Sequence, residues 1–135
     1  MTDEKREAIA RVLETFDAWE RSHLESWRAK ALLSVELDRK GLLEVNAARA
    51  RLTPASLRRD AAAVSRLDDQ DWNRILSFRD AKRRHLRGGH AVLLSGLPRS
   101  AWEECLGLMS ERVWTTKRLR AWISARKMRA GRPTQ

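Results

Sequence analysis

The chain has 135 residues, 42% of them hydrophobic and 34% charged, and its formal net charge at pH 7 is +10. This length suits one compact domain, or one domain with a helical arm, and the mixed signs of charge argue against global disorder. The single cysteine, Cys105, excludes an intramolecular disulfide, and no apolar run reaches the roughly 18 residues of a membrane span. The charged N-terminus shows no signal-peptide core, so we expect a folded cytoplasmic protein.

The positive charge is concentrated in the second half of the chain. Residues 1–73 hold 13 Lys and Arg against 14 Asp and Glu, a net charge of −1, whereas residues 74–135 hold 15 against 4, a net charge of +11. This asymmetry predicts a helical assembly region over 1–73 and a basic helical region over 74–135 that faces a polyanion. We expect a flexible tail from about residue 129.

A long amphipathic helix is predicted at the N-terminus. Thr2 is a candidate N-cap, acidic residues follow it, and Gly41 is a stop signal after Lys40. Apolar positions recur at steps of three and four: Ile9, Val12, Leu13, Phe16, Trp19, His23, Trp27 and Ala31. An unbroken helix of this length would exceed about 50 Å. We therefore expect either a break near residues 28–33, giving a helical hairpin, or packing along a partner.

Further helix signals fill the middle of the chain. Residues 42–52 predict a second helical segment, and Thr53 followed by Pro54 predicts the cap and first residue of a third, which runs to about residue 66. Asp68 or Asp69 is the candidate cap of a fourth. The sequence thus predicts an all-α fold.

The fourth helix is expected to continue through the arginine-rich segment as far as Gly88 and Gly89. Two adjacent glycines are typical of a helix end, where one residue adopts a left-handed conformation. Residues 90–98 are short, apolar and bounded by Gly and Pro, which predicts a buried helix or turn.

Motifs for enzymatic chemistry are absent from the sequence. It holds no phosphate-binding glycine loop, no dinucleotide fingerprint, no zinc-protease motif and no nucleophile elbow. The spacing of His85, His90 and Cys105 matches no common zinc pattern. We predict neither catalysis nor a cofactor nor a metal.

The first basic element lies between residues 79 and 87. On the expected helix, Arg79, Arg83 and Arg87 would line one face and could contact successive phosphates. The alternative is a solvated outer face. The candidate binding residues here are Arg79, Lys82, Arg83, Arg84 and Arg87.

The second basic element looks like a helix-turn-helix. Residues 100–103 fit a capping box that begins one helix, a turn is expected near 112–114, and another helix begins at Thr115 or Thr116. Leu119, Trp122 and Ile123 would form its buried face. Its exposed candidates for a DNA groove are Lys117, Arg118 and Arg120. The alternative is a single continuous helix through Val113.

The C-terminal tail adds a third basic element, with the candidates Arg126, Lys127, Arg129 and Arg132. The run Gly131, Arg132, Pro133 is similar to the core of an AT-hook, whose extended arginine enters a narrow minor groove. The alternative is a tail without fixed structure.

Six tryptophans complete the candidate features. Five are expected in the core or at subunit contacts, because Trp buries a large area. Trp114 adjoins the basic turn and could instead stack on an unpaired base.

These patterns predict a non-enzymatic nucleic-acid-binding protein, DNA before RNA, that acts in transcription regulation or as an accessory protein and dimerises through its N-terminal helices. Two alternatives stay open. One is a small helical subunit of a ribonucleoprotein complex, and the other is a basic adaptor or inhibitor that docks on an acidic protein surface.

Overall fold

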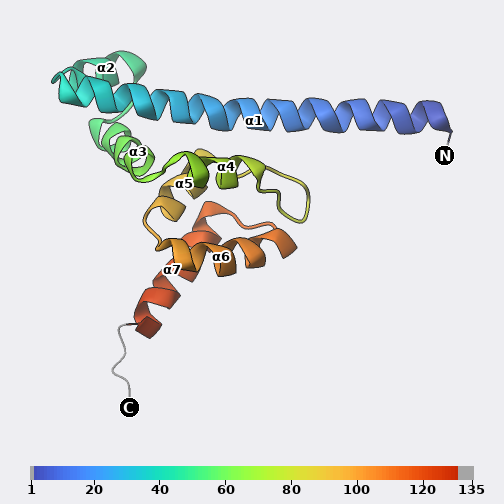
Figure 1. Cartoon of the computed structure of the whole chain (residues 1–135). Coiled ribbons are helices and arrows are strands. Elements are labelled where there is room, and N and C mark those ends of the chain that lie inside the picture. Colours follow the sequence, from blue (N-terminus) through green and yellow to red (C-terminus); the bar gives the residue numbers. More distant parts are fainter. Residues whose placement is uncertain (1, 131–135) are drawn as a thin grey trace.

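The protein is described by a computed structural model that covers residues 2–130, where it has seven helices and no strand, which confirms the predicted all-α class (Figure 1). None of the helices in this range is long and apolar enough to cross a membrane. The elements are α1 (Asp3–Arg39), α2 (Leu43–Ala50), α3 (Pro54–Arg66), α4 (Asp69–Ser77), α5 (Gly88–Ser95), α6 (Arg99–Glu111) and α7 (Thr116–Ala130).

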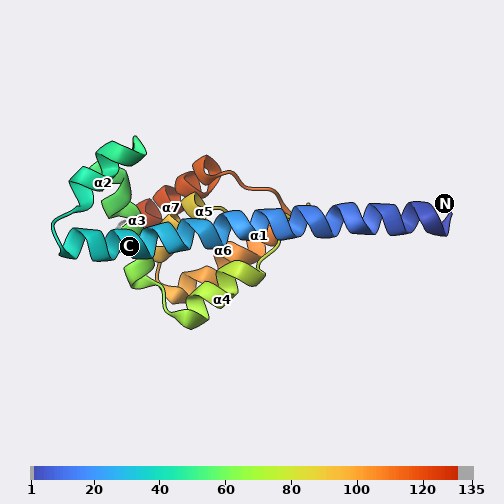
Figure 2. The same ribbon diagram turned by 90° about the horizontal axis from the view of Figure 1, so that it is seen from above.

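Helix α1 has 37 residues. It is continuous through residues 28–33, so the break that the sequence left possible there is absent. The Thr2 hydroxyl accepts a hydrogen bond from the amide of Lys5 at 3.4 Å, as expected of an N-cap. Beyond the other end, Gly41 adopts φ 71°, the left-handed conformation of a helix stop. The N-terminal half of α1 projects away from the remaining helices (Figures 1 and 2).

The predicted starts of α3 and α4 are confirmed. Thr53 accepts a hydrogen bond from the amide of Ser56 at 3.1 Å, and Pro54 is the first residue of α3. Asp68 caps α4 by accepting from the Asp71 amide at 2.7 Å, and the Asp71 carboxylate accepts in return from the Asp68 amide. Both starts rest on contacts within four residues, which explains why the sequence revealed them.

Gly88 and Gly89 begin α5, so the prediction that they end the preceding helix is wrong. Within residues 2–130, the glycine with a positive φ is Gly41. A Cβ on Gly88 would lie 2.4 Å from Trp27 Cδ1, and one on Gly89 would lie 2.7 Å from Thr116 Cγ2. The two glycines therefore allow α5 to approach α1 on one side and α7 on the other.

The capping box predicted over residues 100–103 is also wrong. Helix α6 begins at Arg99, with Pro98 as its N-cap and no side-chain cap. Arg99 instead ties α6 to its neighbours: Nε donates to Asp71 Oδ1 at 2.8 Å, and Nη2 donates to the Arg66 carbonyl at 2.7 Å. Its guanidinium also lies 4.6 Å from the ring centroid of Trp102.

One main core joins residues from both halves of the chain. Leu24 of α1 and Trp72 of α4 pack in the same cluster as residues of α5, α6 and α7. Trp102 is fully buried, and its indole nitrogen donates to the Leu94 carbonyl at 2.9 Å. A smaller cluster of Leu43, Ala47 and Leu57 fixes α2 against α3. The separate roles of residues 1–73 and 74–135 remain a prediction.

Candidate functional site

The segment between α4 and α5 is a tight loop, so the predicted helical row of Arg79, Arg83 and Arg87 is wrong. Helix α4 ends at Ser77, and Phe78 is extended with ψ 139°. Asp80 shapes the loop, because its Oδ1 accepts from the amides of Lys82 at 2.8 Å and Arg84 at 3.0 Å. Arg83 adopts φ 59°, which a helix excludes.

Two acidic side chains of α1 hold this loop in place. Asp17 Oδ1 lies 2.7 Å from His85 Nε2 and accepts from Arg79 Nε at 3.0 Å. Glu20 Oε2 accepts from the amide of His85 at 2.7 Å, and the His85 side chain is only 1% exposed. The hydrogen bond from His85, helped by the charge of Arg79, lowers the pKa of Asp17 despite the opposing effect of burial. Asp17 is therefore ionised and acts as the acceptor.

Arg79 has a structural role in this arrangement. Besides its bond to Asp17, its Nη1 donates to the carbonyls of Leu76 and Phe78, both at 2.7 Å, which closes the end of α4. Of the five candidate binding residues in this segment, this leaves four cations at the surface. Over residues 2–130, no acidic side chain lies within ion-pair distance of these four: Lys82, Arg83, Arg84 and Arg87.

The break between α6 and α7 is present, so the alternative of one continuous helix through Val113 is wrong. Thr115 Oγ1 accepts from the Arg118 amide at 3.1 Å and caps the start of α7. Leu119 and Ile123 are buried and Trp122 is half-buried, as the sequence predicted. The candidates on the other side of α7 are exposed: Lys117, Arg118 and Arg120.

Trp114 belongs to the core, which overturns the idea that it could stack on an unpaired base. Its side chain is only 8% exposed and packs in the main cluster. Its ring lies 6.3 Å from that of Trp122, and the Arg118 guanidinium lies 5.5 Å from its centroid. The remaining surface of Trp114 is thus too small to receive a base.

His90 joins the loop to the turn that precedes α7. Its Nδ1 accepts from the Arg87 amide at 3.1 Å, and its Nε2 lies 2.8 Å from the Trp114 carbonyl, which requires a proton on Nε2. Burial lowers the pKa of His90, and the neutral ring fits both bonds. Both ribbon views place the α4–α5 loop and the α6–α7 turn at the same end of the helical body (Figures 1 and 2).

The last helix carries three more candidate cations within the described residues. Arg126 is half-buried, whereas Lys127 and Arg129 are exposed on α7. Arg132, and with it the segment similar to an AT-hook, lies outside the described residues.

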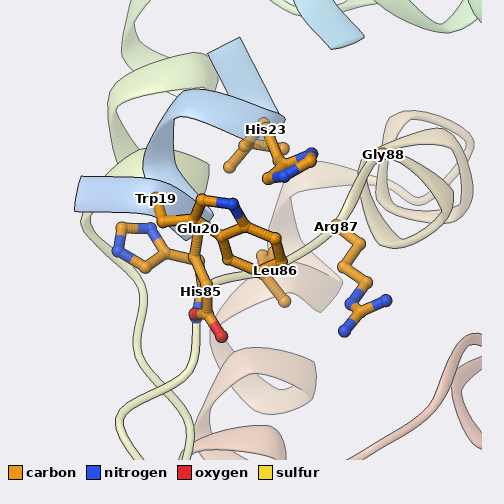
Figure 3. A pocket seen from close by; sticks show the side chains of 8 residues that line it. Trp19, Glu20, His23, His85, Leu86, Arg87 and Gly88 are labelled. Atoms are coloured by element: carbon orange, nitrogen blue, oxygen red, sulfur yellow. The ribbon is translucent and has the colours of Figure 1, made fainter. Parts of the chain in front are cut away.

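A cleft of about 290 Å³ separates α1 from the end of the loop. Figure 3 shows Trp19, Glu20 and His23 reaching from α1 toward the segment that carries Leu86 and Arg87. A wider groove continues beside it, with apolar residues of α1 on one side and the basic loop on the other. Within residues 2–130, no cluster of three or more His, Cys, Asp or Glu side chains could hold a metal ion.

Neither opening contains a nucleophile with its base. Cys105 is buried in α6, and burial, with the nearby charge of Glu104, raises the pKa of its thiol to about 11. No protein family, curated protein sequence or solved structure matches the chain.

Proposed function

We propose that the protein binds nucleic acid, DNA before RNA, as a non-enzymatic regulatory or accessory protein. The observation that carries the proposal is the concentration of exposed cations on one loop and one helix. In the described part of the chain, the exposed cations of the α4–α5 loop and of α7 make no ion pair with an acidic side chain. They are available to phosphates, whose neutralisation releases counterions and drives binding.

The two basic elements suit different parts of a duplex. The loop displays Lys82, Arg83 and Arg84 on a short turn, which favours contacts to the phosphate backbone. Helix α7 buries one side against the core and leaves the cations of its first turns exposed. That is the presentation expected of a helix that lies in a major groove, with α6 preceding it in a helix-turn-helix.

The test is fluorescence anisotropy of the protein with labelled duplex DNA, single-stranded DNA and RNA, from about 50 to 300 mM salt. Log affinity is expected to fall with log salt at a slope of about −0.9 per phosphate contacted on duplex DNA. Failure to bind any of the three near about 150 mM salt would refute the proposal. Tighter binding to RNA or single strands would instead favour the subunit of a ribonucleoprotein complex.

A matched pair of variants locates the surface. Lys82→Gln with Arg84→Gln removes two loop cations and is expected to reduce the salt slope by about 2 and weaken binding to every sequence alike. The control is Arg58→Gln with Arg59→Gln on α3, where both arginines already face acidic side chains. Equal effects of the two pairs would mean that only net charge matters.

A further inference from the structure

The projecting half of α1 carries an exposed apolar stripe, defined as Ile9, Val12, Leu13, Phe16 and Trp19. These five side chains are 47% to 62% exposed, although they follow the helical spacing of a buried face. Further along the same helix, Leu24 and Ala31 are buried against the body. Adjacent large hydrophobic side chains in this number mark an interaction surface rather than scattered surface residues.

We infer that the apolar stripe binds the same stripe of a second copy of this chain, with the two α1 helices antiparallel. The area is sufficient. Phe16 and Trp19 leave about 100 Å² each uncovered, and the five side chains together leave roughly 400 to 500 Å². A stable interface buries about 800 Å² per partner, of which about two-thirds is apolar in homodimers. The stripe supplies most of the apolar part of that area, and its borders supply the rest.

The net charge of the helical body, formed by the helices that follow α1, determines how the two copies are oriented. Residues 74–135 carry a net charge of +11, and their helices lie at one end of the projecting helix (Figure 1). A parallel pair would place the two basic bodies, with their α4–α5 loops, side by side. Like charges held that close cost free energy. An antiparallel pair places the bodies at opposite ends of the paired helices.

The side chains of the stripe also favour the antiparallel register. When Ile9 of one helix lies opposite Trp19 of the other, Val12 lies opposite Phe16. Each aromatic ring then packs against an aliphatic side chain, and the interface is evenly filled. In a parallel pair, Trp19 would meet Trp19 and Ile9 would meet Ile9, which leaves one end crowded and the other loose.

The same register brings opposite charges together. Arg6 of one copy then lies opposite residue 22 of the other. Residue 22 is two residues from Glu20, which is about 3 Å along the helix axis at a rise of 1.5 Å per residue. Glu20 is half-buried beside the loop, and its position at the edge of the groove places an acceptor near the incoming cation. The acidic residues of α1, including Glu4, Glu7 and Glu14, argue against an anionic lipid surface as the occupant.

The first test is sedimentation of the full chain without nucleic acid, from about 1 to 100 µM. We expect a dimer. Val12→Glu with Phe16→Glu should raise its dissociation constant by at least about 100-fold, because four charges enter the seam. Circular dichroism should not change, since neither residue packs in the core. The control is Val45→Glu, which replaces a 60% exposed side chain on α2 and should leave the dimer intact.

Crosslinking tests the orientation, in a Cys105→Ala background. A mixture of Lys5→Cys and His23→Cys chains should form a disulfide between unlike copies, while Lys5→Cys alone should form none. Self-crosslinking of Lys5→Cys would show a parallel pair and overturn the inference. So would a chain that is monomeric at about 100 µM, one whose dimer survives the glutamates, or a monomer that floats with anionic vesicles. None of these readouts involves nucleic acid, so they are independent of the proposed function.

Discussion

Asp17 and His85 are 68 residues apart in sequence, yet their side chains meet with 2.7 Å between Oδ1 and Nε2. This contact attaches the basic loop to the helix that carries the apolar stripe. Because Arg79 donates to the same carboxylate oxygen, one side chain of α1 holds both ends of the segment that displays Lys82, Arg83 and Arg84. The position of the candidate phosphate-binding loop therefore depends on Asp17.

Replacing Asp17 by Asn should destabilise the fold by about 1 to 2 kcal/mol, because it removes the charge that His85 and Arg79 share. The measurement is urea-induced unfolding at neutral pH. The pKa of Asp17 is lowered from its usual 3.8, so its contribution is present above that value and is lost as the pH falls through the folded pKa.

Glu14→Gln is the control for this variant, because Glu14 is exposed on the same helix and makes no hydrogen bond or ion pair with His85 or Arg79. Its free energy of unfolding should stay within about 0.5 kcal/mol of the unchanged protein. A loss equal to that of Asp17→Asn would show that the general charge of α1, rather than this contact, is responsible.

Features that depend on neighbouring residues could be predicted from the sequence. Thr53 with Pro54, and Asp68 with the turn that follows it, satisfy backbone amides within three residues, so their residue types alone reveal the helix starts. The buried face of α7 could be predicted for the same reason, since Leu119 and Ile123 follow the helical period.

The course of the basic loop could not be predicted, because contacts distant in sequence determine it. Residues 79–87 have good helical spacing, but Asp80 forms a competing turn and Asp17 holds Arg79 and His85 outside a helix. The sequence predicts Gly88 and Gly89 as a helix stop for the same reason: Trp27, the packing partner of Gly88, lies 61 residues away. Helical periodicity in the sequence gives no information about such distant contacts.

Stability should fall as the pH drops below about 6.5 because His90 is buried in its neutral form. Burial lowers its folded pKa below the ordinary 6.5, so in this window the unfolded chain binds a proton that the folded chain does not. The contribution is complete above 6.5 and is lost as the pH falls through the folded pKa. Thermal unfolding at several pH values measures the slope.

His90→Gln should lower the melting temperature at pH 7, because it disturbs the bonds to Arg87 and Trp114, and should flatten the pH dependence. His23→Gln, on the exposed surface of α1, should keep the original slope. A slope that persists in His90→Gln would assign the dependence to another group.

Cys105 should be unreactive in the folded protein. Its thiol is buried, with a pKa raised to about 11, and the thiolate is the reactive species. Labelling with Ellman's reagent at about pH 8 should be at least about 100-fold slower than in denaturant. A cysteine introduced by Ser110→Cys, exposed on the same helix, should react at the ordinary rate. Fast labelling of Cys105 would contradict its position in the core.

Gly88→Ala should destabilise the protein by about 1 to 3 kcal/mol, because the added methyl group would lie 2.4 Å from Trp27 Cδ1 and force α5 away from α1. Gly107→Ala is the matched control: nothing lies within 4 Å of its added Cβ in α6, so the loss of backbone freedom in the unfolded chain should stabilise the fold by about 0.5 to 1 kcal/mol. Chemical denaturation of both variants measures the difference. Opposite signs are expected, and a Gly88→Ala variant as stable as Gly107→Ala would mean that α5 does not pack against Trp27 in solution.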